Sequence, residues 1–291
     1  LFSTVLMLAA PARIAGCPKV VLCTPQGADG HIAPEIIYAA NACRVDHIYR
    51  VGGAQAIAAM AYGTESIPRV DKIFGPGNRF VTHAKQLVST TTAIDMPAGP
   101  SEVLVMADHT ARPDYVAADM LSQAEHGPDS QAILVCQSED FAKQVADEVV
   151  RQTALLPRKE LVEKSLSHSR ILIFDTREQM TAFSNAYAPE HLIISMDQPW
   201  QIAEHITAAG SVFIGNYSPE SAGDYASGTN HTLPTSGWAR SFSGVNIDSF
   251  MRKITFQQLS QEGLQSLSQT IVSMAEAEGL HAHAQAVRVR A

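Results

Sequence analysis

Residues 93–136 read AIDMPAGPSEVLVMADHTARPDYVAADMLSQAEHGPDSQAILVC, and this stretch decides the fold. Its composition predicts a strand at Glu102–Met106, a helix at Tyr115–Glu125 and a second strand at Ala132–Cys136. A strand, a helix and a strand of these lengths are typical of a βαβ unit, whose two strands run parallel in one sheet. Ligands of such sheets usually bind beyond the carboxyl ends of the strands, and we expect a site there.

The same alternation of strands and helices extends in both directions from this stretch. Upstream, the sequence predicts strands at Lys19–Cys23, His47–Val51 and Lys72–Phe74, and helices at Pro34–Cys43, Ala54–Tyr62 and Asn78–Val88. Downstream, it predicts strands at Arg170–Phe174, Leu192–Ser195 and Ser211–Ile214, and helices at Asp140–Leu155, Arg177–Ala186 and Trp200–Ala208. We therefore predict an α/β protein with two incomplete Rossmann-like lobes, parallel sheets and a helical C-terminal tail.

The predicted lobes divide the chain into three parts. Residues 1–98 form the first α/β lobe, residues 99–246 form the second, and residues 247–291 form a helical dimerisation tail, with a seam near Met96–Pro100. Within the second lobe, Gly215–Asn246 is rich in Pro, Gly, Ser, Asn and Thr, and irregular segments of this length are usually functional. The tail has predicted helices at Thr255–Ser260 and Leu264–Glu278 but too little mass to fold alone, so we expect it to pack on the body or on a second subunit.

Composition excludes several classes of function. The chain has 291 residues, of which 46% are hydrophobic, which is enough for a sizeable core. Its net charge of −8 argues against binding to nucleic acid or to an anionic membrane. No apolar run approaches the ~20 residues that a membrane-spanning helix needs. The four cysteines form no CxxC pair, which favours a reducing, cytoplasmic location.

Gln123 and His126 are candidate metal ligands. They lie three positions apart at the end of a predicted helix, and residues with this spacing share one helix face. Asp224 and His283 could supply further donors, and imidazole with carboxylate suits zinc. An amide ligand is unusual, however, and no HExxH pattern is present. His126 could instead help to cap the helix, so spacing alone leaves the metal site open.

The pair Glu190-His191 is a candidate for acid–base chemistry. Histidine is the usual general base near neutral pH, and a neighbouring carboxylate can activate water. Adjacent residues on a strand point to opposite faces, so the two can share a site only if they lie in the turn before the strand. Pro189 favours that turn, although a simple surface turn is the alternative. His231, in the glycine-rich loop, could contact a polar ligand or solvent.

Two glycine turns each follow a predicted strand and open a predicted helix. Gly52-Gly53-Ala54-Gln55 is the first, and Gly75-Pro76-Gly77-Asn78 is the second. The free N–H groups at a helix N-terminus favour anions such as a pyrophosphate. Neither turn matches the GxGxxG fingerprint, so each taken alone is more typical of a tight connection between strand and helix than of a nucleotide site.

An ordered set of motifs resembles the histidinol dehydrogenase family over nearly the whole chain. The motifs occupy residues 51–58 (VGGAQAIA), 72–78 (KIFGPGN), 94–102 (IDMPAGPSE), 121–131 (LSQAEHGPDSQ), 189–192 (PEHL) and 218–231 (SPESAGDYASGTNH). The resemblance implies a homodimeric enzyme that uses zinc and NAD. It implies oxidation of L-histidinol to L-histidine through L-histidinaldehyde, with reduction of two NAD, as the last step of histidine biosynthesis.

The resemblance also assigns a role to each candidate residue. It implies zinc ligands at Gln123, His126, Asp224 and His283, and an acid–base pair at Glu190 and His191. It implies substrate contacts at Ser101, His231 and Glu278, in addition to the zinc ligands and His191, and NAD contacts at Gln55 and Asn78. Glu278 and His283 would be contributed to the site by the partner subunit.

The family has an N-terminal portion that this chain lacks. Two alternatives therefore stand beside the dehydrogenase. The first is a catalytically incomplete fragment that binds only metal or substrate. The second is a zinc hydrolase that uses Glu190, which is disfavoured because four protein ligands would leave no open position on the metal.

Overall fold

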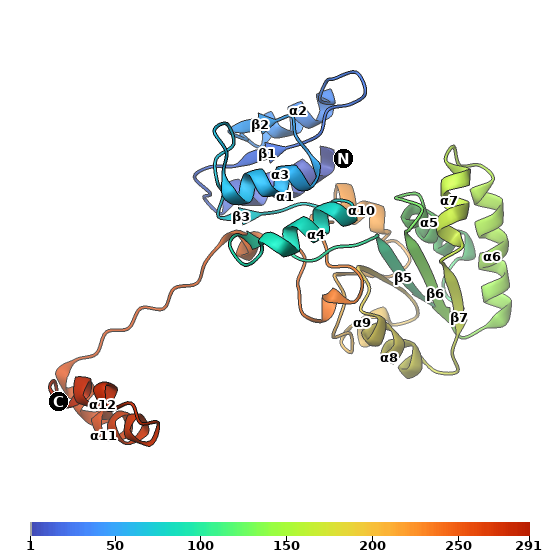
Figure 1. Cartoon of the computed structure of the whole chain (residues 1–291). Helices are drawn as coiled ribbons and strands as arrows, with labels where there is room; N and C mark the ends of the chain where they lie inside the picture. The colour runs from blue at the N-terminus through green and yellow to red at the C-terminus, as the bar shows by residue number, and fades with distance from the viewer. Residues whose placement is uncertain (1) are drawn as a thin grey trace. The chain divides into compact units, whose positions relative to one another are not determined.

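The computed structural model describes residues 2–291, which divide into two compact units, a larger one that ends at Met251 and a smaller one that spans Arg252–Ala291. The larger unit is an α/β assembly of parallel sheets and helices (Figure 1). The smaller unit contains helices α11 (Gln261–Ala277) and α12 (His281–Arg288), which pack on each other. The predicted fold class, with parallel sheets and a helical tail, is confirmed.

A five-stranded parallel sheet organises most of the larger unit. Its strand order is β7-β6-β5-β8-β9. The strands are β5 (Glu102–Ala107), β6 (Gln131–Cys136), β7 (Arg170–Ile173), β8 (His191–Ser195) and β9 (Ser211–Ile214). The helices around it are α5 (Pro113–Ala124), α6 (Glu139–Thr153), α7 (Lys159–Leu166), α8 (Arg177–Tyr187) and α9 (Pro199–Ala203). Helices α6 and α7 lie on one side of the sheet in Figure 1, and α8 and α9 lie on the other.

The central strand β5 shows why the sheet is covered on both faces. Val103 and Val105 point into a core shared with α5 and α6, whereas Leu104 and Met106 point into a second core shared with α8 and α9. All four side chains are fully buried. A continuous apolar run of this kind is expected for a parallel strand with helices on both faces.

The first part of the chain contains two smaller parallel sheets. Strands β1 (Val21–Cys23) and β2 (His47–Tyr49) form one, and β3 (Lys72–Ile73) and β4 (Ala93–Ile94) form the other. The helices of this part are α1 (Phe2–Ile14), α2 (Pro34–Ala42), α3 (Gly53–Tyr62) and α4 (Arg79–Val88). The sheets therefore change between Ile94 and Glu102, where the sequence predicts a seam. The further division into lobes at position 98 stays a prediction.

Two predicted helices differ from the structure. Helix α9 ends at Ala203 and not at Ala208, and residues 255–260 form no helix. Residues 255–260 are exposed, and the side chain of Ser260 caps α11 by accepting a hydrogen bond from the N–H of Gly263 at 3.1 Å. Ile254, Thr255 and Phe256 are weak helix formers, and within the smaller unit no partner buries Phe256, which is 92% exposed.

Several short elements were not predicted from the sequence. Among them are α7, β4 and a helix α10 (Glu220–Tyr225) inside the segment expected to be irregular. Each is too short to show a period of its own and depends on tertiary packing: Val162 of α7, for example, packs against Leu121 and Ala124 of α5. The missed α10 matters most, because it carries Asp224.

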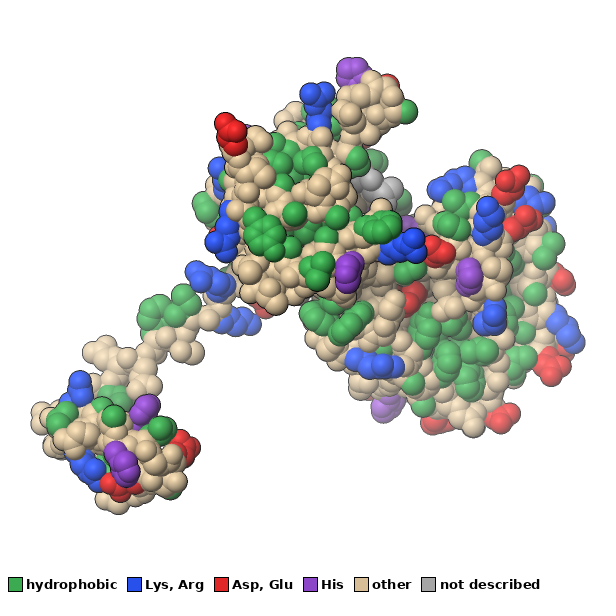
Figure 2. Space-filling model, in the orientation of Figure 1, with side chains coloured by type: hydrophobic (Ala, Val, Ile, Leu, Met, Phe, Trp, Pro, Cys, Tyr) green, Lys and Arg blue, Asp and Glu red, His purple; other side chains and the backbone are tan. Residues whose placement is uncertain are grey.

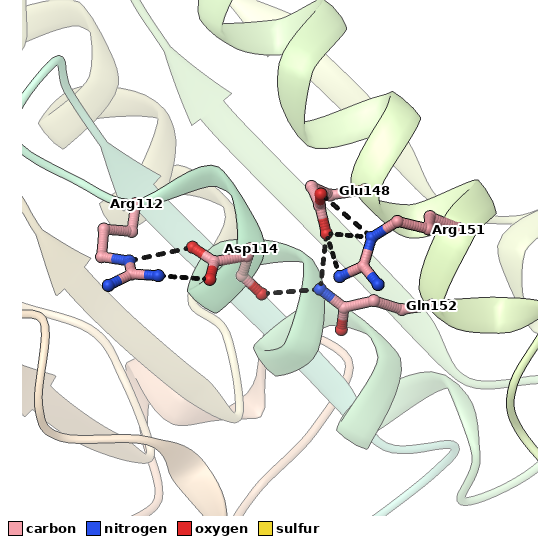
Figure 3. Close-up of polar contacts among 5 residues, drawn as sticks. All are labelled: Arg112, Asp114, Glu148, Arg151 and Gln152. Atoms are coloured by element: carbon pink, nitrogen blue, oxygen red, sulfur yellow. Dashed lines mark hydrogen bonds and ion pairs between the residues drawn. The ribbon is translucent and has the colours of Figure 1, made fainter.

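Helix α5 is attached to α6 by surface polar contacts (Figure 3). Gln152 donates to the main-chain oxygen of Asp114 at 2.9 Å, and Arg112 and Arg151 pair with Asp114 and Glu148. Exposed pairs of this kind contribute little to stability, so the apolar core holds α5 in place. Figure 2 shows charges of both signs interspersed over this region, as is typical of a solvated helix surface.

Among residues 2–291 no helix is long and apolar enough to cross a membrane.

A polar network occupies the carboxyl end of β5. Asp108 is 5% exposed, pairs with Arg177 at 2.9 Å, and accepts the N–H of Thr110 and of Asp197. Burial alone would raise the pKa of Asp108, but the hydrogen bonds from Thr110 and Asp197, together with Arg177, outweigh burial and bring its pKa below the usual value. The ionised form of Asp108 therefore stabilises the fold.

We expect Asp108→Asn to lower the free energy of unfolding by about 1–3 kcal/mol at pH 7, because Arg177 loses a charged partner. A carboxyl whose pKa is lowered in the folded state stabilises above its unfolded pKa of about 4, and this contribution is lost as pH falls through the folded pKa. The difference in the free energy of unfolding between Asp108→Asn and wild type should therefore disappear in acid. Urea unfolding, followed by circular dichroism at several pH values, measures this free energy.

Exposed Asp175, at the end of β7, provides the control. Asp175→Asn should leave the unfolding curve almost unchanged at both pH values. If Asp108→Asn lowers the free energy of unfolding by the same amount at low pH as at pH 7, the network does not depend on the ionised carboxylate.

Candidate active site

Glu190 and His191 lie together at the amino end of β8, beside the start of β5. Strand β8 begins at His191, so Glu190 belongs to the turn before it and the two side chains are not forced to opposite faces. Ala188 adopts a left-handed conformation in that turn, with φ of 54°, and Gly210 closes it from the other side. A Cβ on Gly210 would lie 2.5 Å from the carbonyl oxygen of Glu190, so only glycine allows this approach.

The main chain of Glu102, the first residue of β5, holds both side chains. Its N–H donates to Glu190 Oε2 at 2.8 Å, and its carbonyl oxygen lies 3.1 Å from His191 Nδ1. Glu190 and His191 are 5% and 4% exposed, and Nδ1 lies 3.7 Å from Glu190 Oε2. One peptide segment therefore brings a carboxylate and an imidazole into one site.

The contact with Glu102 fixes which nitrogen of His191 is basic. A carbonyl oxygen only accepts, so Nδ1 carries the hydrogen and Nε2 carries the lone pair. Nε2 is buried and has no hydrogen-bond partner among the described residues. Burial lowers the pKa of His191 to about 3, and His126 and His231 add to that effect, so the ring is neutral at pH 7. A neutral imidazole with a free Nε2 can accept a proton.

The predicted ligands Gln123, His126 and Asp224 gather close to this pair. Atoms of His126, Glu220 and Asp224 that could bind a metal all lie within 4.8 Å of one another. Gln123 is fully buried, and with its amide nitrogen facing Glu220 it donates to the two carboxylate oxygens at 2.9 and 3.0 Å. The same nitrogen lies 3.3 Å from His191 Nδ1, which places the cluster directly beside the predicted base.

Sequence reasoning missed Glu220. It lies four residues before Asp224 on α10, so the two carboxylates share a helix face. The signal was present in the 218–231 motif, but the surrounding glycines and serines led to the prediction of an irregular segment. Recognising a helix there would have placed Glu220 next to Asp224.

Helix α10 packs unusually closely on β9. A Cβ on Gly223 would lie 2.5 Å from the ring of Phe213 and 2.6 Å from Thr229 Oγ1. The Phe213 ring in turn lies beside His191, with 6.0 Å between ring centres. Gly223 therefore sets how near Glu220 and Asp224 come to the amino end of β8.

The cluster contains more negative charge than the protein itself neutralises. Burial raises the pKa of Glu190 well above its usual value, and Glu102 and Asp224 raise it further. Burial also raises the pKa of Glu220 well above its usual value, and its acidic neighbours Asp224, Glu190 and Asp119 contribute. A bound cation would relieve this repulsion.

The expectation of a site beyond the carboxyl ends of the strands is wrong for these residues. Glu102, Glu190 and His191 all lie at the amino ends of β5 and β8. The carboxyl end of β5 holds the network of Asp108 and Arg177 described above. The site is instead built from the loops that enter the strands and from α10.

Comparisons with known proteins agree with this geometry. The family model for histidinol dehydrogenase matches residues 1–291. The chain belongs to the histidinol dehydrogenase family. It is 57% identical to the histidinol dehydrogenase of Bacteroides thetaiotaomicron over 100% of this chain and 68% of the relative, and 56% identical to that of Vibrio parahaemolyticus over 99% and 67%.

Solved structures show the same relationship. The crystal structure of histidinol dehydrogenase from Elizabethkingia anophelis matches with a TM-score of 0.97 and 56% identity, over 99% of this chain and 67% of that chain. An acetylating aldehyde dehydrogenase from Geobacillus thermoglucosidasius, with a TM-score of 0.51 and 13% identity, shares the fold alone. Family membership makes the chain an oxidoreductase by relationship.

The remaining residues that the histidinol dehydrogenase resemblance singles out lie in three places. Ser101 directly precedes Glu102 at the amino end of β5. His231 Nε2 lies 3.3 Å from Thr4 Oγ1, and its charge interacts with that of Asp224. Glu278 and His283 belong to the smaller unit, where Glu278 ends α11 and His283 is exposed on α12. Their assignment to the site stays a prediction.

The two glycine turns, at residues 52–55 and 75–78, are structurally constrained. Asn78 caps α4, and its side-chain oxygen accepts from the N–H of Phe80 and of Val81 at 3.1 and 3.2 Å. A Cβ on Gly77 would lie 2.4 Å from Val81 Cγ1. Gly53, with φ of 74°, lies directly beneath the side chain of Gln55. The oxygen of Asn78 is thus already used, and its amide N–H₂ group is the part left for a ligand.

Two surface hollows share no residue with the cluster of acidic and histidine side chains. One has a volume of about 510 Å³ and lies between β7 and α8, and the other has a volume of about 400 Å³ and lies between α5 and α6. Neither contains a histidine or a nucleophilic side chain among its lining residues. The side chains that could bind a metal or transfer a proton therefore lie in the buried cluster and not in these hollows.

We expect Gly223→Ala to weaken zinc binding by about ten-fold or more, because the added methyl group forces α10 away from Phe213 and displaces Glu220 and Asp224. Competition with a chromophoric chelator measures zinc affinity. Ser221→Ala, an exposed change on the same helix, is the control and should bind zinc as wild type does. Equal affinity of Gly223→Ala and wild type would show that the spacing of α10 does not set the metal site.

Proposed function

We propose that this chain catalyses the oxidation of L-histidinol to L-histidine through L-histidinaldehyde, with zinc and two NAD, as the last step of histidine biosynthesis. The observation that supports this most strongly is the neutral His191, whose Nε2 is free and buried beside Gln123 and the group of His126, Glu220 and Asp224. Family membership supplies the substrate, because the relatives are named histidinol dehydrogenases.

The residues of the cluster fit a zinc ion. Imidazole and carboxylate donors converge there, the Gln123 amide lies beside them, and the uncompensated buried carboxylates favour a divalent cation. We assign Gln123, His126 and Asp224 as its ligands from this chain. His283 of a second copy completes the proposed set, and this homodimeric arrangement gives the helical tail a function.

When bound, zinc would hold the imidazole and amine of histidinol, and NAD would accept a hydride in each of the two oxidations. In the first oxidation, His191 Nε2 accepts the proton of the substrate alcohol as the carbon gives up its hydride. The Nδ1 hydrogen stays directed at the Glu102 carbonyl, so the ring keeps its orientation as its charge changes.

Glu190 acts in the second half of the reaction. Its carboxylate accepts a proton from the water that adds to the aldehyde carbon, which gives the hydrate that is oxidised to the carboxylate. Burial among acidic neighbours makes Glu190 a stronger base than an exposed glutamate, and a bound cation favours its ionised form. The low exposure of both residues limits loss of the reactive aldehyde.

The proposed contacts to substrate and NAD lie around this centre. Ser101 and His231 contact the substrate from this chain, and Glu278 of a second copy contacts it from the tail. Gln55 and Asn78 contact NAD at the N-termini of α3 and α4, where free N–H groups favour the pyrophosphate.

We expect the zinc-loaded chain to form NADH from histidinol, and His191→Ala to reduce kcat by about 10²- to 10⁴-fold with little change in zinc affinity. NADH absorbance measures the rate, and treatment with a chelator should abolish it until zinc is restored. His205→Ala is the control, since His205 is exposed after α9. Zinc-linked thermal stabilisation without any NADH would favour a fragment that only binds metal or substrate.

We also expect subunit complementation. A His283→Ala chain has an intact site of its own but gives its partner an incomplete one, whereas a His126→Ala chain does the reverse. Mixing two inactive single variants should therefore restore part of the activity, because some mixed dimers contain one complete site. If the mixture stays as inactive as its components under conditions that exchange subunits, the shared site is wrong.

A further inference from the structure

Glu220 has no role in the proposed function, although it is one of the most deeply buried carboxylates in the chain. Its side chain is 1% exposed. Among residues 2–291 no lysine or arginine forms an ion pair with Glu220, and its histidine neighbour, His191, places Nδ1 3.7 Å from Glu220 Oε1. Burying a carboxylate without a cationic partner is costly, so a nearby group must compensate for it.

The contact that accounts for Glu220 is with Gln123. With the Gln123 amide placed so that its nitrogen faces α10, that nitrogen lies 2.9 and 3.0 Å from the two carboxylate oxygens of Glu220. An ionised carboxylate only accepts hydrogen bonds, so ionised Glu220 fixes the nitrogen end of the amide toward α10 and leaves the oxygen end directed away from Glu220. Without Glu220, only the cation itself would select the oxygen end of the amide, and the side chain would lose conformational freedom on binding.

We propose that Glu220 is a positioning residue, which fixes the Gln123 amide so that its oxygen is the donor to the metal. This inference rests on the proposed zinc site and explains how that site can use an amide ligand. Glu220 acts through Gln123 and is not a metal ligand itself. The same Gln123 nitrogen lies 3.3 Å from His191 Nδ1, so the amide is next to the proposed base.

A double-mutant cycle on zinc affinity tests this inference in the whole chain. Glu220→Gln and Gln123→Ala should each weaken zinc binding by about ten-fold or more. Because Glu220 acts through Gln123, adding Glu220→Gln to Gln123→Ala should cause no further loss. Glu125→Gln removes an exposed carboxylate between the two predicted ligands of α5 and should bind zinc as wild type does.

The outcomes separate this inference from the proposed function. If the two losses multiply, Glu220 binds the metal directly and the positioning role is wrong. Unchanged zinc affinity in Glu220→Gln would also overturn the positioning role. Failure of the wild-type chain to bind zinc at all would overturn the proposed function together with the inference.

Cobalt substitution gives a second measurement that does not depend on affinity. The visible absorption of bound Co²⁺ reports its donor set, so the spectrum of Glu220→Gln should resemble that of Gln123→Ala. A spectrum of Glu220→Gln that matches wild type would contradict the inference.

Circular dichroism on each variant checks that it has folded, and Glu220→Asp replaces Glu220→Gln if the neutral variant has not folded. The shorter carboxylate should also weaken zinc binding, because it cannot reach the amide nitrogen from the same backbone position.

Discussion

The hydrogen bonds of one peptide segment, the main chain of Glu102, determine the geometry of the site. Its N–H holds Glu190 and its carbonyl holds His191, and both contacts follow from the parallel pairing of β5 with β8, in which Val103 is opposite His191. Main-chain groups are fixed by the sheet, so they orient the two side chains without the entropy cost of ordering another side chain. The buried core on both faces of β5 therefore supports the chemistry at its amino end.

Charge is the second constraint on this site. Glu190, Glu220 and Asp224 are all buried within a small volume, and the described residues place no lysine or arginine in an ion pair with them. Such an arrangement would destabilise the fold unless a cation joined it, which links metal binding to stability as well as to substrate binding. Gly223 and Gly210 allow the close approach, because a Cβ at either position would overlap a neighbour.

The strands and helices with a clear period could be predicted from the sequence, and so could the position of Glu190 in the turn before its strand. Gln123 lies in the last turn of α5, but the helix ends at Ala124, so His126 follows it in the turn and the two do not share a helix face. The short helix α10 could not be predicted, because packing against Phe213 and not local preference stabilises it, and Glu220 was lost with it. The choice of the amino ends of the strands was also not predictable, since it depends on which loops carry the functional groups.

The central claim is that Gln123, His126 and Asp224 bind one divalent cation beside His191. Anomalous diffraction at the zinc absorption edge, from crystals grown with zinc, tests it most directly. A single strong peak should lie within bonding distance of the imidazole of His126, a carboxylate oxygen of Asp224 and the amide oxygen of Gln123. A peak bound elsewhere, or a zinc ion that contacts the nitrogen end of the Gln123 amide, would contradict the account.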